Sequence, residues 1–201
     1  TLVLGSGGGN GVWMALLRGS KSVTAVEINP LIPRILCGSL GDFSGPVYRQ
    51  PQVELNVENA RTFVRRDNRK YDIVTLTYVD TLASTSGGAY ALTENYLYTV
   101  EAFRDFLSRV APQGIFAFLR TRTRLPADDV KATLLAREAL RRLGINDSRG
   151  HIIIVGTWSI KTRGVTEVLV KKETFTAAEI SAVRQFALRN GFDLLYVPGA
   201  P

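Results

Sequence analysis

The first thirty residues hold the feature that most constrains the fold, a glycine-rich turn between two short apolar segments. Residues 1–4 form an apolar run, five glycines crowd positions 5–11, and residues 12–17 are apolar at helical spacing. A second apolar segment, residues 23–26, ends on Glu27. Glycine lets the backbone approach a ligand, and the start of a helix offers unpaired N–H groups. An acid about 20 residues further on can accept hydrogen bonds from ribose hydroxyls, so the stretch predicts a nucleoside site.

The spacing of the glycines narrows the choice of ligand. A dinucleotide-binding turn has the pattern G-x-G-x-x-G. Counted from Gly5, the third glycine falls on Asn10, and counted from Gly7 it falls on Val12. The sequence instead fits G-x-G-x-G at Gly5, Gly7 and Gly9. The alternative interpretation is a doubly wound sheet whose tight turn binds no ligand.

The composition is that of one globular domain. The chain has 201 residues, of which 45% are hydrophobic and 21% are charged, and this is enough for a single full core. Cys37 is the only cysteine, so no internal disulfide is possible, and we expect it to pack in a helix. With His151 as the only histidine, the sequence predicts no zinc site.

The net charge of +7 raises the question of anionic partners. The basic residues are scattered, with small clusters at 65–70 and 120–124, so we interpret them as a solvated surface and expect no nucleic-acid partner. No signal peptide is evident, and no apolar run approaches the roughly 18 residues of a membrane helix. Because the sequence opens directly on a strand, we expect residues 1–201 to be a single ligand-binding domain excised from a longer chain.

Strand and helix patterns alternate along the chain, which predicts an α/β fold with a doubly wound, mostly parallel sheet. Seven strands are expected, and the last two are joined by the short stretch Ser159–Gly164, as an antiparallel hairpin requires. The expected strands are Thr1–Leu4, Val23–Val26, Val53–Val57, Tyr71–Thr77, Ile115–Leu119, His151–Val155 and Val165–Val170. The expected helices are Val12–Leu17, Pro30–Gly38, Ala60–Arg66, a helix capped by Thr93 that runs to Val110, Ala127–Leu143 and Ala177–Asn190. Gly41–Gln50 is expected to be a loop.

Four features follow strands of the predicted sheet at their carboxyl ends. They are the Gly5–Gly11 turn, Glu27, Asn59 and the loop Thr77–Leu92. Ligands of doubly wound sheets bind outside the carboxyl ends of the strands. The four features therefore converge on one candidate site.

Most of residues 1–118 resembles the spermidine synthase branch of the class I S-adenosylmethionine-dependent methyltransferase fold. The resemblance is carried by VLGSGGGNG, VTAVEINP, NARTFVRRDNRKYDIV and ALTENYLYTVEAFRDFLSRVAPQGIFAF. Further along, HIIIVG and TFTAAEISAVRQFALRNGF are similar to a bacterial subgroup in which this domain follows a membrane-embedded N-terminal part. The resemblance implies a Rossmann-like transferase domain in the cytoplasm, as the soluble part of an inner-membrane protein. It also implies a small-molecule substrate and leaves a homodimer open.

The resemblance assigns the ligand contacts residue by residue. Gly5, Gly7, Gly9 and Asn10 would line the amino-acid end of S-adenosylmethionine or its decarboxylated form, and Glu27 would hold the ribose. Asn59 stands where the family has an acid that meets the adenine amino group, and Ala60 follows it in the same motif. An asparagine can accept there through its carbonyl. Ile28 would pack on the adenine face, or else belong to the core.

The chain departs from the family at the end of the fourth strand. Aminopropyltransferases carry two acids there, the first of which activates the attacking amine. Here the aligned residues are Thr77, Tyr78, Val79 and Asp80, so a threonine replaces the base. We expect Asp80 to contact the substrate, the alternative being a turn-forming aspartate. Tyr78 would line the acceptor pocket or else pack at the end of the strand. Glu94 is either a further substrate contact or a helix-dipole partner.

Three functions remain open at this point. Methyl transfer with an unknown acceptor is favoured, because it needs alignment and desolvation more than a strong base. A polyamine aminopropyltransferase is the alternative, in which Asp80 or a group outside this sequence supplies the base. The third is a non-catalytic nucleoside-binding module of a membrane protein.

Overall fold

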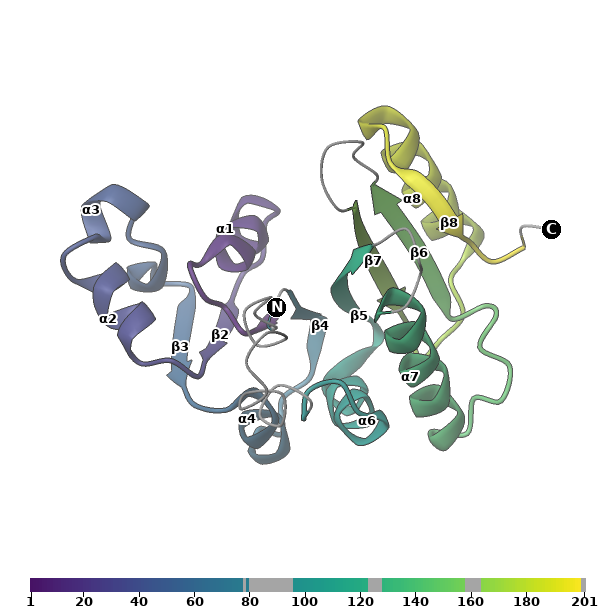
Figure 1. Ribbon diagram of the computed structural model, residues 1–201, viewed down its shortest axis with the longest axis horizontal. Helices are drawn as coiled ribbons and strands as arrows, with labels where there is room; N and C mark the ends of the chain where they lie inside the picture. The colour runs from purple at the N-terminus through teal and green to yellow at the C-terminus, as the bar shows by residue number, and fades with distance from the viewer. Residues whose placement is uncertain (78, 80–95, 123–127, 158–163, 200–201) are drawn as a thin grey trace.

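The computed structural model describes residues 1–77, 79, 96–122, 128–157 and 164–199, and in these ranges it forms one eight-stranded sheet in the order β3-β2-β1-β4-β5-β7-β6-β8 (Figure 1). Parallel pairing joins β3 to β2, β2 to β1, β1 to β4 and β4 to β5, while β7, β6 and β8 complete the sheet in antiparallel fashion. The strands are β1 Leu2–Leu4, β2 Val23–Glu27, β3 Val53–Val57, β4 Tyr71–Leu76, β5 Val110–Arg122, β6 Ile152–Thr157, β7 Gly164–Val170 and β8 Asp193–Tyr196. The expected mostly parallel sheet with an antiparallel end is confirmed.

The predicted number of seven strands is wrong, because β8 is an eighth. This strand follows Gly191 and lies at the edge of the sheet, where it pairs with β6. Leu194 and Leu195 remain 37% and 39% exposed, so the segment shows no clear apolar pattern. It is a strand because the free edge of β6 supplies hydrogen-bonding partners.

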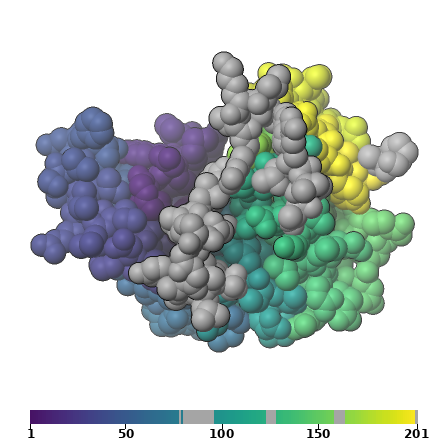
Figure 2. All heavy atoms as spheres, viewed as in Figure 1, coloured from purple at the N-terminus to yellow at the C-terminus, as the bar shows by residue number. Residues whose placement is uncertain are grey.

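The described helices cover both faces of the sheet, as a doubly wound fold requires. They are α1 Asn10–Leu17, α2 Leu31–Cys37, α3 Gly41–Ser44, α4 Ala60–Arg66, α6 Val100–Arg109, α7 Asp128–Arg142 and α8 Ala177–Asn190. Figure 1 shows α2 and α3 at one end of the molecule and α8 with β8 at the other. Figure 2 shows that the N-terminal and C-terminal parts of the chain fill these opposite ends.

Two predictions about helices need correction. Within the described residues 96–109, the helix expected from a Thr93 cap begins at Val100, because the Thr99 side chain accepts a hydrogen bond from the Ala102 N–H and caps the helix there. Thr93 itself lies outside the described residues. The expected loop Gly41–Gln50 contains α3 and a 3₁₀ helix, Val47–Arg49, whose first two residues are buried. The cap of α8 by Thr176 is part of a complete capping box with Glu179.

The core is divided differently on the two faces of the sheet. On the face of α4, α6 and α7, one continuous apolar cluster runs from β2 to β6, and within it Phe103 packs against Phe116 and Phe118. The opposite face has two separate clusters. One lies between the first strands, α1 and the 3₁₀ helix, and the other lies between the last strands and α8.

Candidate functional site

The glycine turn between β1 and α1 has a backbone that only glycine adopts without strain. Gly5, Gly7 and Gly9 all have positive φ angles, of 70°, 49° and 85°. A Cβ on Gly5 would lie 2.1 Å from Val79 Cγ1, and one on Gly9 would lie 2.6 Å from Val47 Cγ1. The turn is therefore packed from two sides by segments distant in the sequence.

The turn leads directly into α1, which begins without a side-chain cap. Gly9 is the N-cap residue in left-handed conformation, and the first helical hydrogen bond runs from the Trp13 N–H to the Gly9 carbonyl. The N–H groups of the first turn of a helix carry partial positive charge and suit an anionic ligand group. Asn10, the first helical residue, is exposed at this point.

The Glu27 carboxylate is buried, with 6% of its surface exposed, and it fixes the turn. Its Oε2 accepts a hydrogen bond of 2.8 Å from the Gly7 N–H, and its Oε1 accepts one of 2.8 Å from the Asn29 N–H. Each carboxylate oxygen can accept a further hydrogen bond. The acid is therefore held rigidly at the end of β2 with acceptor capacity left for a ligand.

Tyr48 is a site residue that the sequence analysis missed. Its hydroxyl donates a 2.5 Å hydrogen bond to the Gly7 carbonyl and lies 2.9 Å from the Ser6 hydroxyl. Burial raises the pKa of this phenol, so it stays protonated. Gly7 is thus held through its N–H by Glu27 and through its carbonyl by Tyr48. No local pattern marks such a contact across 41 residues; a tyrosine inside a predicted loop is the only available signal.

Asn59 stands at the start of α4 and caps it. Its Oδ1 accepts hydrogen bonds from the Arg61 N–H at 2.9 Å and the Thr62 N–H at 3.3 Å. The carbonyl proposed to meet adenine is therefore committed to the helix, and the side-chain NH₂ is the group left for a ligand. Ala60 is 8% exposed, and the Arg61 Nε lies 3.1 Å from Asp105 Oδ2 of α6, which holds α4 in place.

The remaining predicted residues are only partly within the described chain. Ile28 is 62% exposed, so its interpretation as a core residue is wrong, and the adenine contact stays a prediction. Thr77 follows β4, and its Oγ1 lies 2.9 Å from Thr75 Oγ1. Tyr78, Asp80 and Glu94 lie outside the described residues.

The sheet brings the described residues of the site to one edge. Leu4 pairs with Val26 on one side and with Leu76 on the other, so the residues that follow them stand at one level. These residues are Gly5, Glu27 and Thr77. Asn59 follows β3, which pairs with β2 through Glu27 and Val57. The predicted convergence is thus confirmed for these elements, while the binding roles stay predictions. Within the ranges given above, no group of His, Cys, Asp and Glu could hold a metal ion.

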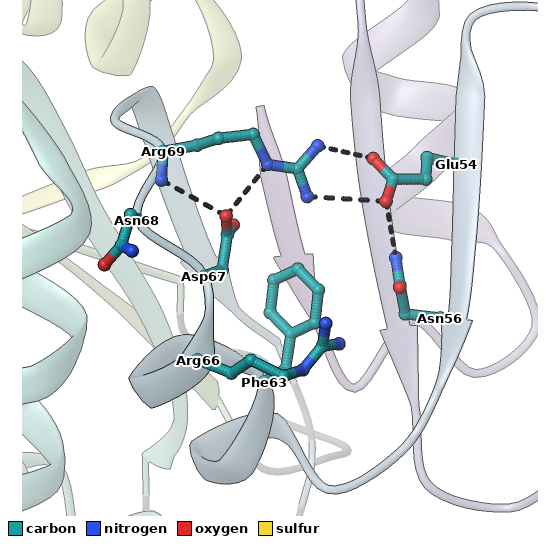
Figure 3. Close-up of a pocket in the computed structure, with 7 residues that line it drawn as sticks. All are labelled: Glu54, Asn56, Phe63, Arg66, Asp67, Asn68 and Arg69. Carbon is teal, nitrogen blue, oxygen red and sulfur yellow. Dashed lines mark hydrogen bonds and ion pairs between the residues drawn. The ribbon is translucent and has the colours of Figure 1, made fainter.

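A polar groove of about 520 Å³ lies near the opposite edge of the sheet, between β3 and the segment that leads from α4 into β4. Figure 3 shows the Arg69 guanidinium between Glu54 and Asp67, with hydrogen bonds to both carboxylates. Hydrogen bonds from Arg69 lower the pKa of Glu54. Tyr71 donates a hydrogen bond to Asp67, and burial together with this bond raises the Tyr71 pKa to about 12. Arg69 thus pairs with both of the acids that line this groove, so we interpret it as a structural network.

Comparison with known proteins supports the fold. Spermidine synthase from Thermotoga maritima superimposes with a TM-score of 0.62 and 16% identity, over 98% of this chain and 60% of that one. A spermidine synthase in complex with the transition state analogue AdoDATO superimposes with a TM-score of 0.60 and 16% identity, over 98% of this chain and 60% of that one. The chain therefore shares the fold of these solved spermidine synthases.

The similarity in sequence to known proteins is weaker than the similarity in fold. Polyamine aminopropyltransferase from Sulfolobus acidocaldarius is 26% identical over 114 residues, which is 56% of this chain and 35% of that protein. No family model matches the chain. The chain thus spans about a third of its curated relative and 60% of the solved structures. Among the described helices, none has the length and apolar character needed to cross a membrane.

Proposed function

We propose that this domain binds S-adenosylmethionine or its decarboxylated form at the carboxyl edge of the sheet and transfers a group from it to a small-molecule acceptor. The observation that carries the proposal is the Glu27 carboxylate held against the Gly7 N–H at the end of β2. A buried acid beside a glycine turn matches a ribose whose two hydroxyls donate hydrogen bonds. The likeness in fold to spermidine synthases supports the same ligand class.

The described residues contact different parts of the ligand. Glu27 orients the ribose, the turn from Gly5 to Gly9 approaches the amino-acid end, and the start of α1 favours a carboxylate there. Asn59 and Ala60 stand beside the adenine, with Ile28 available to cover its face. When bound, the ligand supplies an electrophilic carbon on a sulfonium, and the chain's task is to align an acceptor with it and exclude water.

Methyl transfer is the reaction that we favour. Thr77 replaces the acid that would deprotonate an ammonium, and its hydroxyl lies against that of Thr75. A threonine hydroxyl is a poor base at neutral pH, whereas a methyl acceptor can react with alignment as the main requirement. Aminopropyl transfer remains the second candidate, and the similarity to the polyamine aminopropyltransferase favours it.

Calorimetric titration with S-adenosylmethionine, its decarboxylated form and methylthioadenosine tests the proposal. Preference for S-adenosylmethionine supports methyl transfer, and preference for the decarboxylated form supports aminopropyl transfer. Failure of all three to bind would reject the proposal in favour of a fold without its chemistry.

The variant Glu27→Ala sharpens this test. We expect it to weaken binding of methylthioadenosine by about 1.5–3 kcal/mol, since hydrogen bonds to a charged group are lost. Glu173→Ala, an exposed acid far along the chain, is the matched control and should bind as the parent does. Equal affinity of Glu27→Ala and the parent would remove the ribose assignment.

A further inference from the structure

Three basic side chains from three segments of the chain gather where α6 ends and β5 begins. The Lys70 ammonium donates a 2.5 Å hydrogen bond to the Ser108 carbonyl, and the Lys172 ammonium donates one of 2.8 Å to the Val110 carbonyl. Arg109 stands between these two carbonyls in the chain. The cluster formed by Lys70, Arg109 and Lys172 has no part in the candidate nucleoside site.

The topology of the sheet brings these segments together at the edge opposite that site. β4, β5 and β7 are adjacent strands (Figure 1). Lys70 directly precedes β4, whose first residue pairs with the first residue of β5. Lys172 lies two positions after the last residue of β7. Since β7 is antiparallel to β5, its end is directed toward the beginning of β5.

The positive charge of the cluster exceeds the negative charge around it. In the part of the chain that the structure describes, none of the three basic side chains forms an ion pair. The carbonyl end of α6 offers only about half a negative charge. Asp105 of α6 is already bound by Arg61 and Arg65, and Glu173, which follows Lys172, is exposed to solvent.

The cluster also has hydrogen-bond donors left over. Each lysine ammonium has three N–H groups, of which the structure uses one for a backbone carbonyl. The Arg109 guanidinium bonds to Asn68 Oδ1 at 3.4 Å, while its Nε is buried without a partner. Burial and the charge of Lys70 lower the pKa of Lys172, and the opposing charge of Glu173 does not reverse this shift. An anion at this place would relieve the repulsion.

We propose that Lys70 and Lys172 bind a phosphate group at this edge of the sheet, with Arg109 adding to the positive potential. A phosphate carries nearly two negative charges and several acceptor oxygens, so one group can accept from both ammoniums at once. The alternative is that the three side chains only complete the end of α6, as basic side chains do at many helix C-termini. One cation suffices for half a charge, whereas three leave a surplus.

The inference goes beyond the proposed function and does not depend on it, because the cluster and Glu27 lie at opposite edges of the sheet. The first test follows the Lys172 pKa by ¹³C NMR of dimethylated lysines, which keep their charge, with assignment by Lys172→Gln. We expect inorganic phosphate to raise this pKa toward the ordinary value of 10.5. Sodium chloride at equal ionic strength should leave it lowered.

Glycerol phosphate, used in the same way, identifies the source of the group. A shift as large as that with inorganic phosphate would show that the cluster accepts phosphate esters. A shift with inorganic phosphate alone would show that it takes the free ion. A Lys172 pKa that neither probe changes would overturn the inference.

Calorimetric titration with inorganic phosphate tests the same cluster in the unmodified protein. Glutamine keeps an N–H donor for the backbone carbonyl and removes the charge, so Lys70→Gln and Lys172→Gln should fold and lose about tenfold or more in phosphate affinity. Lys131→Gln, an exposed position on α7, is the matched control and should bind phosphate as the parent does. If Lys131→Gln weakens binding as much as the other two variants, the three side chains only cap α6. All three variants should bind methylthioadenosine as the parent does, whichever way the phosphate test falls.

Discussion

We propose that Tyr48 acts on the candidate ligand site by holding the glycine turn rather than by contacting a ligand. Its hydroxyl holds the Gly7 carbonyl at 2.5 Å while Glu27 holds the N–H of the same residue. We expect Tyr48→Phe to lower the affinity for methylthioadenosine about three- to tenfold and the free energy of unfolding by about 1–2 kcal/mol, because a buried carbonyl loses its donor. Calorimetry and denaturant unfolding measure the two effects.

A second tyrosine serves as the control for this prediction. Tyr71 is equally buried, at 7% exposure, and its hydroxyl also donates a hydrogen bond, but to Asp67 at the other edge of the sheet. Tyr71→Phe should lose stability and keep ligand affinity. If both variants bind methylthioadenosine equally well, Tyr48 is merely structural.

Asn59 offers a variant in which binding should improve. An aspartate retains a carboxylate oxygen for the two N–H groups that Asn59 Oδ1 now caps, and adds a second oxygen where the side-chain NH₂ stands. That oxygen can accept from the adenine amino group. We expect Asn59→Asp to bind methylthioadenosine about tenfold more tightly or better, as measured by calorimetry. Weaker binding at unchanged stability would place the adenine elsewhere.

At the scale of elements, Arg69 joins the edge strand β3 to the segment before β4. It bridges Glu54 and Asp67 (Figure 3). The Arg69 and Glu54 side chains are about half exposed, so solvent screens the pair. We expect Arg69→Ala to cost about 0.5–1.5 kcal/mol in urea unfolding at pH 7. The structure gives no reason for a change in ligand affinity.

The pH dependence of that cost has a definite sign. Hydrogen bonds from Arg69 lower the pKa of Glu54; burial alone would raise the pKa of Asp67, but bonds from Tyr71 and Arg69 lower it overall. Acids with lowered pKa values stabilise the folded state above their unfolded pKa and lose this effect as pH falls. The difference between Arg69→Ala and the parent should therefore shrink below about pH 4. A difference that is constant from pH 7 to pH 3 would contradict the assignment.

At the scale of the whole molecule, Glu167 should make the protein less stable as pH rises, which is opposite to the effect of Glu54 and Asp67. Burial raises its pKa to about 7 in the folded state, above the ordinary value of 4.5. Between these values the folded chain binds more protons than the unfolded chain, so this group makes stability fall as pH rises. We expect the free energy of unfolding of Glu167→Gln to exceed that of the parent by about 1–3 kcal/mol at pH 8, and by less at pH 5. Parallel stability profiles would show that Glu167 is paired.

Local patterns predicted the parts of the fold that depend on local chemistry. The alternating strands and helices, the glycine turn, Glu27 at the end of β2 and the Thr176 cap all follow from neighbouring residues. The features that were missed depend on distant ones. Strand β8 needs the edge of β6, and Tyr48 needs the turn 41 residues earlier.

The division of the core has a consequence for the way the domain holds together during fluctuations. Only the face of α4, α6 and α7 has an uninterrupted apolar layer, and Phe103 with Phe116 and Phe118 forms its middle. The opposite face has one cluster beside α1 and the 3₁₀ helix and a separate one beside α8. The two ends should therefore open as distinct cooperative units, hinged along the phenylalanine layer. A ligand that contacts both of these clusters would join the two ends on the face where the core itself is divided.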